Sequence, residues 1–555
     1  MSLRIVVVGG GIAGLATAGL LARDGHDVEL LERHDTLGGR AGSWARDGFR
    51  FDTGPSWYLM PEVFDHWFRL MGTTADEQLD LVALEPAYRV FFEGHARPLD
   101  VANDRAANVA AFDALEPGAG ARLDRYLDSA HDTYDMALRH FLYTSFASWR
   151  PFADRAVLAR LHQLAPLLGR SLESRVARDF DDVRLRQVLG YPAVFLGSSP
   201  DRTPSMYHLM SALDLDGGVR YPLGGFAHLI SAMAGLATTA GVTVRTSARV
   251  TAVTTASMST SEGRSTGAGR GSGTGAPGPR VPAPHRPRAR VTGVRWVDAD
   301  GLEQHTEADV VVTAADLHHV ETDLLPPELR SRPPRSWRRG DPGPGGVLAM
   351  LGVRGRVPQL AHHSLLFTAD WRENFGAIRA GRVPSPASLY VCTPSRTDPT
   401  VAPPGDENLF LLVPVPADPS LGRGGVDGDG DPVVEQVADA AIDRVADWAG
   451  VPDLRERIAV RRTVGPGDFA ADLSAWSGGL LGPAHTLRQS AMFRAGNLSR
   501  RVAGLLHAGG STIPGVGLPM CLISAELVLK RVRGDTSATP LPDSLTASPE
   551  VGVGS

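Results

Sequence analysis

The sequence predicts an α/β protein, and three observations support this fold class. The chain opens with a β-branched run over Arg4–Val8, a helix-like segment over Ile12–Asp24 and a second strand-like run over Val28–Leu31. Another strand-like run covers Ala308–Thr313. Near the other end, a strand-like run, a glycine-rich turn and a helix-like segment over Cys521–Arg531 follow one another again. Alternating strands and helices are typical of a parallel sheet covered by helices.

Composition restricts the class further. The 555 residues are enough for two or three structural units, and 43% hydrophobic with 21% charged residues is ordinary globular usage. A net charge of -6 and a pI of about 6.3 argue against a basic nucleic-acid-binding protein. The two cysteines, Cys392 and Cys521, exclude a disulfide-stapled secreted domain and a four-cysteine zinc site.

A glycine pattern lies where the first strand meets the first helix. Gly9, Gly11 and Gly14 have the spacing in which the first glycine permits a tight turn, the second admits a pyrophosphate and the third allows close helix packing. Glu32 ends the second strand, where a carboxylate can bind a ribose hydroxyl. The pattern predicts a Rossmann-like dinucleotide site, and the acid favours FAD or NAD over NADP.

A second glycine turn favours FAD over NAD. Gly38-Gly39-Arg40 follows shortly after Glu32, and an arginine suits bidentate contact with a phosphate from the opposite side. The turn over 509–517 precedes the C-terminal helix, whose N-terminus we expect near the flavin ring or the diphosphate. FAD is therefore the predicted cofactor.

The predicted cofactor site combines residues from several segments. They are Gly9, Gly11, Ala13, Gly14, Glu32, Arg33, Gly39, Arg40, Gly54, Pro55, Ser56, Val250, Gly510, Gly517, Leu518 and Pro519. Trp57 and the turn Gly515–Pro519 are expected to line the site beside Arg40, and no catalytic residue is assigned.

The predicted domains are interleaved along the chain. Residues 1–110, 218–320 and 488–533 are expected to form one discontinuous FAD-binding domain, and 321–487 a substrate-binding domain with a mixed sheet. The alanine- and leucine-rich segment 111–217 predicts a helical lid or membrane-associated subdomain. Ser/Thr/Gly/Pro/Arg-rich sequence predicts a disordered insertion over 254–290 inside a hairpin, and a disordered tail over 534–555.

Motifs along the whole chain resemble the bacterial-type phytoene desaturase family of carotenoid biosynthesis, within the FAD-dependent amine-oxidase-like superfamily. The glycine signature is shared with amine oxidases, protoporphyrinogen oxidases and guanine-nucleotide-dissociation inhibitors, whereas the middle motifs are specific. The motifs are Phe51-Asp52-Thr53-Gly54-Pro55-Ser56, Arg220-Tyr221-Pro222-Leu223-Gly224-Gly225, Ala308–Val312 with Ala315-Asp316, His362-His363-Ser364, Tyr390–Ser395, Asp398–Gly405 and Gly509–Pro519. The turn Ala508–Thr512 departs from the family pattern, which leaves its flavin-contacting side chain open.

The resemblance implies an FAD-dependent oxidoreductase that acts on CH–CH bonds. It would introduce double bonds into phytoene on the way to lycopene, by hydride transfer from an allylic C–H to flavin N5 and loss of a neighbouring proton. A long apolar polyene would be its substrate, and quinone or oxygen its electron acceptor. The alternative is a related ketolase or oxidase, a later-stage desaturase or an isomerase on the same scaffold. A non-catalytic isoprenoid carrier is least favoured, because the dinucleotide motif is complete.

Other chemistries are disfavoured. Asp427, Asp429 and Asp431 imitate the start of a calcium loop, but Pro432 and Ala438 stand at its sixth and twelfth positions, so no metal site is assigned. The His362-His363 pair offers metal ligands or acid–base groups, yet a structural role is favoured. Many amine oxidases use a lysine-held water. The only lysine, Lys530, is expected to face solvent, which disfavours that mechanism.

An arginine-rich, aromatic segment suggests contact with a membrane surface. Residues 139–178 hold seven arginines against Asp154 and Glu173, interleaved with aromatics such as Phe146 and Trp149. Such a helix suits an anionic bilayer surface. The alternative is a helical subdomain that packs its apolar stripe inward. No transmembrane span is expected, and we predict a cytoplasmic protein at the inner face of the cell membrane.

Overall fold

The computed structural model describes residues 2–146, 167–258 and 287–545, and within these residues the chain forms three main sheets. The central sheet has five strands whose neighbours all run parallel. In spatial order they are β20 (Leu505–His507), β13 (Val310–Thr313), β1 (Arg4–Val8), β2 (Asp27–Leu31) and β9 (Thr243–Arg245). Almost every residue of β1 is buried, as expected for a parallel strand covered on both faces.

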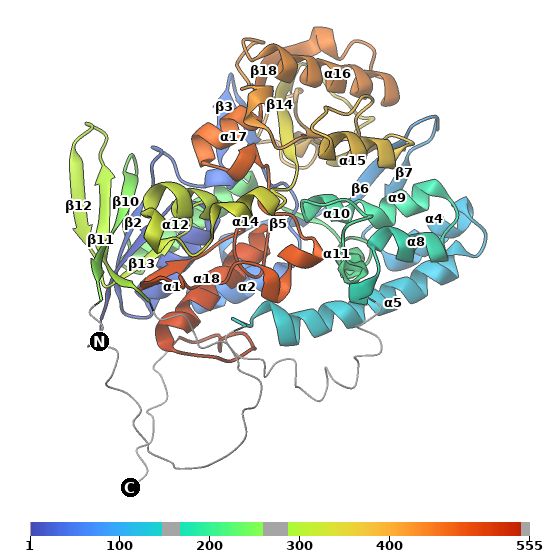
Figure 1. Ribbon diagram of the computed structural model, residues 1–555. Coiled ribbons are helices and arrows are strands. Elements are labelled where there is room, and N and C mark those ends of the chain that lie inside the picture. The colour runs from blue at the N-terminus through green and yellow to red at the C-terminus, as the bar shows by residue number, and fades with distance from the viewer. Residues whose placement is uncertain (1, 147–166, 259–286, 546–555) are drawn as a thin grey trace, which may run out of the picture.

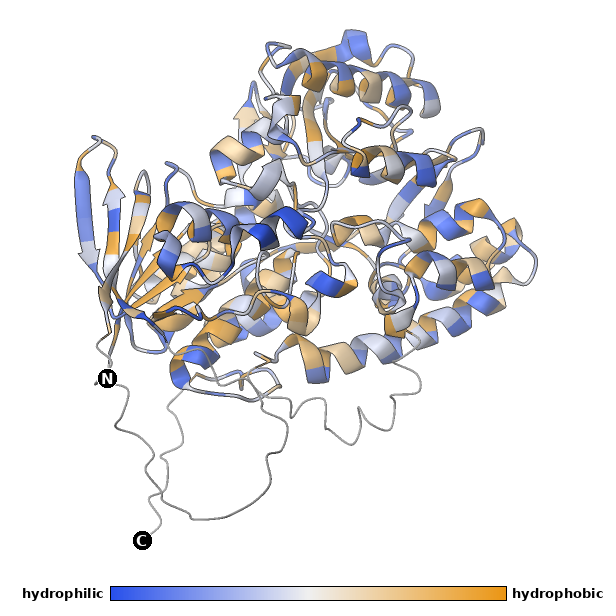
Figure 2. Cartoon of the chain, viewed as in Figure 1, coloured by the Kyte–Doolittle hydropathy of each residue, from blue (hydrophilic) through white to orange (hydrophobic). Residues whose placement is uncertain are grey.

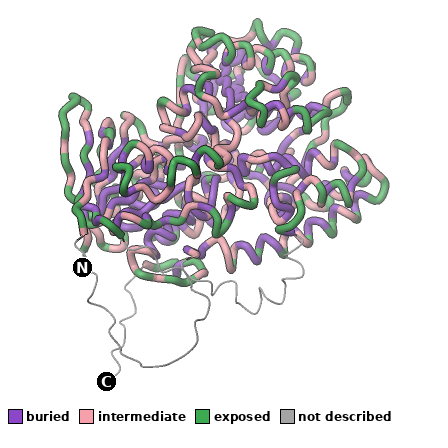
Figure 3. The backbone as a smooth tube through the Cα atoms, in the orientation of Figure 1, coloured by how far each residue is buried: buried purple, intermediate pink, exposed green. Residues whose placement is uncertain are grey.

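Helices cover one face of the central sheet (Figure 1). They are α1 (Ile12–Arg23), α2 (Pro61–Leu70), α12 (Gly225–Thr239) and α18 (Leu518–Arg533). Ile5 and Val7 of β1 point toward these helices and share one core with them. The sheet, α12 and α18 all pack on α1, which is therefore apolar and buried along nearly its whole length (Figures 2 and 3). The predicted strand–helix alternation at both ends of the chain is confirmed.

A second, mainly antiparallel sheet covers the other face of the central sheet, with one parallel pair between β11 and β19. It consists of β10 (Arg249–Ser257), β11 (Ala289–Val297), β12 (Glu303–Glu307) and the short β19 (Val502–Ala503). Val6 and Val8, which alternate with the helix-facing residues of β1, join the core of this layer. β10 and β11 form the predicted hairpin, but 254–257 and 289–290, predicted as ends of the disordered insertion, are paired strand residues because the two strands continue each other's ladder. Residues 259–286 of the predicted insertion lie outside the described residues.

The third sheet has seven strands and builds the other half of the molecule. Its order is β18 (Ile458–Val464), β14 (Gly345–Val353), β17 (Glu407–Val415), β16 (Leu389–Cys392), β15 (His363–Phe367), β6 (Tyr88–Phe92) and β7 (Leu99–Val101). One core joins it to α16 (Pro432–Trp448), and another joins it to the helical region. Figure 1 shows α16 above this sheet and α4, α5 and α8 beside it.

The helical region predicted over 111–217 is present among the described residues. Its helices are α4 (Arg105–Leu115), α5 (Ala119–Ala137), α8 (Leu172–Asp179), α9 (Val183–Gly190), α10 (Pro192–Phe195) and α11 (Met210–Asp214). Trp149 and the rest of 147–166 lie outside the described residues. None of the helices within the described ranges is long and apolar enough to cross a bilayer.

Shorter elements connect these layers. They are the hairpin β3 (Ser43–Arg46)/β4 (Phe49–Asp52), the pair β5 (Leu81–Ala83)/β8 (Arg220–Pro222), and the helices α3 (Ala75–Gln78), α13 (Leu317–His319), α14 (Pro334–Arg339), α15 (Trp371–Arg379) and α17 (Pro466–Leu473).

The structure differs from the predicted organisation in two further places. β6 and β7 lie within residues 1–110 but belong to the third sheet, because strand pairing is decided by partners far along the chain. Residues 535–545 of the predicted tail pack on α18 and α2: Leu541 is buried, and Asp543 pairs with His66 at 3.2 Å. The remaining tail residues, 546–555, are outside the described part.

Candidate cofactor site

The first glycine turn lies between β1 and α1, and its glycines differ in the space available for a side chain. A Cβ at Gly14 would lie 1.8 Å from the carbonyl oxygen of Gly9, so only glycine lets α1 start this close to the turn. A Cβ at Gly11 would meet nothing closer than the carbonyl oxygen of Gly38, at 3.7 Å. Gly11 therefore presents backbone to open space, as a diphosphate-binding turn requires.

Glu32 is the first residue after β2, and its side chain is 6% exposed. Its carboxylate accepts hydrogen bonds from the amides of Gly10, at 2.6 Å, and His34, at 2.9 Å. These bonds hold the carboxylate at the glycine turn. A carboxylate offers about four lone-pair positions, so it can still accept a bond from a ribose hydroxyl.

The second glycine turn lies directly against the first. The amide of Gly38 donates to the carbonyl of Gly10 at 2.9 Å, and a Cβ at Gly39 would lie 3.3 Å from Cα of Gly11. Gly38 and Gly39 both have positive φ, which favours glycine. The two turns thus enclose the space in front of Gly11 from two sides, the arrangement expected around one diphosphate.

Arg40 belongs to this second turn. Its Nε donates to the carbonyl of Leu480 at 3.1 Å, and its Nη2 lies 3.9 Å from the carboxylate of Asp316. Nη2 is buried and has no hydrogen-bond partner among the residues that the structure describes. Gly54 packs against the carbonyl of Arg40, where a Cβ would come within 2.1 Å. The guanidinium is therefore positioned with spare donor capacity, which fits an anionic group such as the diphosphate of FAD.

The C-terminal turn completes this edge of the central sheet. A Cβ at Gly509, just after β20, would lie 3.2 Å from that of Ala13 in α1. The buried Arg494 holds the turn by donating to the carbonyls of Thr512, at 3.0 Å, and Gly510. Gly517 has a φ of 113° and precedes α18, with Leu518 and Pro519 in its first turn. The turns after β1, β2 and β20 therefore meet at the carboxyl edge of the strands, where ligands of such sheets bind.

Three predicted cofactor residues have protein partners of their own. Arg33 reaches over to the end of α17 and donates to Ser474 Oγ at 2.9 Å. Ser56 Oγ lies 2.6 Å from the hydroxyl of Tyr390 in the third sheet. Val250 is buried in the core between the central and second sheets. Pro55 lies between Gly54 and Ser56. The contacts of all these residues with FAD stay predictions.

An aromatic cluster packs beside these turns, at the junction with the third sheet. Trp57 follows Ser56, and its ring stacks on His363 with centroids 4.3 Å apart and planes 9° apart. The rings that surround Trp57 come from Tyr88, Tyr191, Phe195, His363 and Tyr390. Apart from the position of Trp57, the sequence gives no local signal for this cluster, because its members come from distant segments.

The two histidines of this cluster are uncharged, and the neighbouring Asp214 titrates near neutral pH. Burial lowers the pKa of His362 to about 3 and that of His363 well below its usual value, so both imidazoles are neutral. Asp214, 2% exposed, accepts hydrogen bonds from Tyr88, at 3.0 Å, and Tyr191. Burial raises the pKa of Asp214 to about 7, against the opposing effect of these hydroxyls. The cluster therefore presents apolar rings and neutral imidazoles beside the glycine turns.

Three motifs that carry the family resemblance meet at one joint. Asp52 caps α12 by accepting bonds from the amides of Phe226, at 2.9 Å, and Ala227, at 3.2 Å. A Cβ at Gly225 would come within 2.6 Å of the Asp52 carboxylate. Asp398 accepts a bond from the amide of Gly224 at 2.7 Å. The Phe-Asp-Thr-Gly, Pro-Leu-Gly-Gly and Asp-Pro-Thr motifs thus form a structural joint between the two halves of the molecule.

The expectation that Lys530 faces solvent is wrong. Its side chain is fully buried near the far end of α18, where Nζ donates to the carbonyls of Tyr143, at 3.2 Å, and Thr539. Glu526 lies 3.9 Å away. The surrounding carbonyls come from segments far along the chain, so the helix sequence alone does not show the burial. Lys530 remains remote from the N-terminus of α18, which the glycine turns surround.

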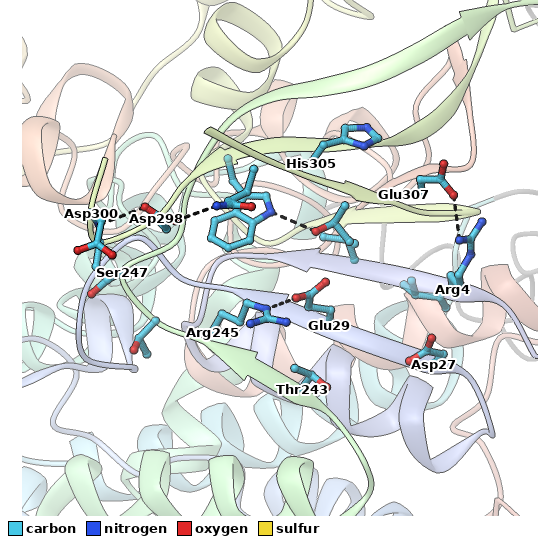
Figure 4. A pocket seen from close by; sticks show the side chains of 17 residues that line it. Arg4, Asp27, Glu29, Thr243, Arg245, Ser247, Asp298, Asp300, His305 and Glu307 are labelled. Carbon is cyan, nitrogen blue, oxygen red and sulfur yellow. Dashed lines mark hydrogen bonds and ion pairs between the residues drawn. The ribbon is translucent and has the colours of Figure 1, made fainter. Parts of the chain in front are cut away.

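A cavity of about 950 Å³ lies elsewhere (Figure 4). It opens between the central sheet and the β11–β12 strands, and its charged side chains pair with one another, such as Arg4 with Glu307 at 3.0 Å and Arg245 with Glu29. The glycine turns do not line it, so we do not assign it to the cofactor.

Comparison with known proteins identifies relatives over the whole chain. Residues 12–273 match the family of flavin containing amine oxidoreductases. The carotenoid 3,4-desaturase of Haloarcula japonica is 37% identical over 94% of this chain and 96% of its own. The phytoene dehydrogenase of Streptomyces griseus is 34% identical over 96% and 95%, and the zeta-carotene-forming phytoene desaturase of Myxococcus xanthus is 32% identical over 99% and 98%.

Solved structures show the same fold at low sequence identity. An oxidoreductase from Methanosarcina mazei aligns with a TM-score of 0.57 at 15% identity, over 95% of this chain and 100% of the other. Wild-type putrescine oxidase bound to putrescine aligns with a TM-score of 0.57 at 14% identity, over 96% and 99%. With relatives above 30% identity over nearly its full length, the chain belongs to the carotenoid desaturase family of FAD-dependent oxidoreductases.

Proposed function

We propose that this enzyme introduces double bonds into phytoene on the way to lycopene. The observation that supports this best is the aromatic cluster around Trp57, with its neutral histidines, next to the two glycine turns. A hydrocarbon polyene offers no charge or hydrogen-bonding group, so its site needs apolar walls and uncharged polar groups.

The chain's own residues would position the cofactor and exclude water. FAD, when bound, supplies the hydride acceptor. The amides of the two glycine turns and the guanidinium of Arg40 would hold its diphosphate, and the carboxylate of Glu32 its ribose. The rings around Trp57 would keep water from the reacting carbons.

Amine oxidation by way of a lysine-held water is not supported by the geometry. The only lysine in the sequence, Lys530, is already bound to backbone carbonyls at the far end of α18. Desaturation of a polyene needs no such group.

A later-stage carotenoid desaturation is the second candidate. It is favoured by the 37% identity to the Haloarcula japonica protein, whose name places its reaction at carbons 3 and 4. The same glycine turns and the same aromatic cluster around Trp57 would serve both reactions.

Expression in two bacterial hosts separates the candidates. In cells that accumulate phytoene, we expect loss of phytoene and new absorption bands at longer wavelength, read by chromatography with absorbance detection. Conversion of lycopene in a lycopene-accumulating host, with phytoene untouched, would favour the later-stage reaction. Intact phytoene and lycopene with a full complement of bound FAD would contradict both.

Peripheral attachment to the inner face of the cell membrane is also proposed, with quinone or oxygen as electron acceptor. It is supported by the insolubility of the substrate and by the arginine- and aromatic-rich sequence over 139–178. Among these residues, Arg175 is directed inward, because it donates to Ser129 at 3.0 Å and lies over the ring of Tyr126.

A further inference from the structure

Two adjacent histidines and a cysteine meet inside the third sheet. His363 begins β15 and Cys392 ends β16, and the two residues are directly paired across these antiparallel strands, which places their side chains on the same face. His362 immediately precedes β15. A ring nitrogen of each histidine and Sγ of Cys392 all lie within 4.8 Å of one another, and all three residues are buried.

Each imidazole is anchored through its Nδ1 atom. Nδ1 of His362 lies 2.8 Å from Thr397 Oγ1, and Nδ1 of His363 lies 2.7 Å from the hydroxyl of Tyr390. Both Nε2 atoms are buried and have no hydrogen-bond partner within the described part of the chain. Buried polar atoms are nearly always satisfied. Anchoring of one ring nitrogen by a neighbouring group is how proteins orient histidines whose other nitrogen binds a metal.

The protonation states are compatible with metal binding. Both imidazoles are neutral, which is the form that coordinates metal ions. Burial raises the pKa of Cys392 to about 12, so the free protein holds a thiol. Metal binding therefore has to release one proton from this group.

We propose that His362, His363 and Cys392 bind one zinc ion. Nitrogen and sulfur ligands are the set that Zn²⁺ prefers, and a buried water would complete the coordination. On binding, the S–H bond of Cys392 breaks, a zinc–sulfur bond forms and the proton leaves to solvent, with no change of oxidation state. Zinc–ligand bonds of about 2.0–2.3 Å set the ligand atoms roughly 3.5 Å apart, so the side chains would approach one another by roughly 1 Å.

The ion would act on the aromatic cluster around Trp57, beside the cofactor site. The ring of His363 stacks on Trp57, and its Nδ1 contacts the same Tyr390 hydroxyl that meets Ser56. Zinc would fix the position of the His363 ring, and with it the position of the Trp57 ring that stacks on it. A buried water alone would satisfy the imidazoles but would leave Cys392 protonated, and this difference is measurable.

The test starts from flavin-containing enzyme that is exposed to Zn²⁺ and then desalted. We expect one zinc per flavin by elemental analysis, and X-ray absorption that shows one sulfur at about 2.3 Å and two imidazole nitrogens at about 2.0–2.1 Å. Chelation should lower the melting temperature, and added Zn²⁺ should restore it. Co²⁺ loaded instead should give d–d absorption at wavelengths beyond the flavin bands.

Variants distinguish this site from adventitious binding. Cys392→Ser and His363→Gln should lose the zinc while keeping FAD, whereas Cys521→Ser, which changes the other cysteine, should keep one zinc per flavin. Zinc-free wild-type enzyme after exposure to Zn²⁺, or a zinc shell without sulfur, would overturn the proposal. If a variant fails to fold, the X-ray absorption of the wild-type enzyme still decides between zinc and water.

Discussion

Gly11 and Gly14 differ in what a side chain at each position would meet. Gly11 has extended backbone that any residue adopts, and a Cβ there projects into open space between the two glycine turns. We expect Gly11→Ala to fold normally but to bind FAD at least ~10-fold more weakly, a loss of about 1.4 kcal/mol, because the methyl group occupies the predicted diphosphate position. Flavin absorbance per chain after dialysis measures this effect.

A second glycine provides the matched control for this prediction. Gly235 lies exposed in α12, and a Cβ there would meet nothing within 4 Å. Gly235→Ala should leave the FAD content unchanged and raise stability by about 0.5–1 kcal/mol. Equal flavin retention in the Gly11 and Gly235 variants would refute the assigned phosphate turn.

Asp214 predicts a pH dependence of stability. Because its pKa is raised to about 7 in the folded protein, the folded state keeps a proton that the unfolded chain has released. The stability contributed by this neutral carboxyl is complete below its unfolded pKa and is lost as the pH rises to about 7 and above. Asp214→Asn keeps a neutral group at every pH. The melting temperature of the variant minus that of the wild type should therefore increase between about pH 5 and about pH 8.

Burial raises the pKa of Asp52 to about 6, so this carboxyl also contributes stability that is lost as the pH rises. It is present in both proteins and so cancels in the comparison. One pKa unit corresponds to about 1.4 kcal/mol, so the effect of Asp214 amounts to a few kcal/mol at most. A difference in melting temperature that does not change with pH would show that Asp214 is ionised throughout.

At the scale of elements, α18 depends on the segment that follows it. The amide of Leu541 donates to Glu526 at 2.6 Å, and the carbonyl of Thr539 accepts from Lys530. In a chain that ends at Gly534, the buried side chains of Glu526 and Lys530 lose these hydrogen bonds. We expect a loss of about 2–3 kcal/mol in the free energy of unfolding by denaturant. A chain that ends at Leu545 retains these contacts and is the control, and indistinguishable unfolding of the two truncations would count against the assignment.

The elements that could be predicted are those with local signals. Glycine spacing and β-branched runs predict the β1–α1–β2 unit, and the strands on both sides of the low-complexity insertion predict the β10–β11 hairpin. The burial of Lys530 has no local signal. It depends on the carbonyls of Tyr143 and Thr539, which lie outside α18, so the sequence pattern of α18 does not predict it. The ring cluster around Trp57 and the pairing of His363 with Cys392 likewise arise only when distant strands meet.

At the scale of the whole molecule, the enzyme has to obtain a water-insoluble substrate. Phe146 packs partly against the core below α18, and Trp149 lies outside the described residues. We expect the double variant Phe146→Ser/Trp149→Ser to sediment less with anionic liposomes, because both changes reduce the apolar surface that this segment can offer to lipid.

Trp448→Ser, which changes a partly exposed ring on α16, is the control for sedimentation. Equal flavin content and melting temperature would show that both proteins are folded. Liposome binding that is the same in wild type and double variant would discard the membrane contact at this segment.

The joint at the start of α12 links the two halves in one further way. Asp52, at the end of β4, and Asp398, in the loop between β16 and β17, both accept hydrogen bonds from amides at the start of α12. Separating the two halves would remove the hydrogen-bond donors of both carboxylates at once. Partial unfolding of one half therefore destabilises the other. We therefore expect a single cooperative thermal transition, in which occupancy by the flavin nucleotide also protects the seven-stranded sheet from proteolysis.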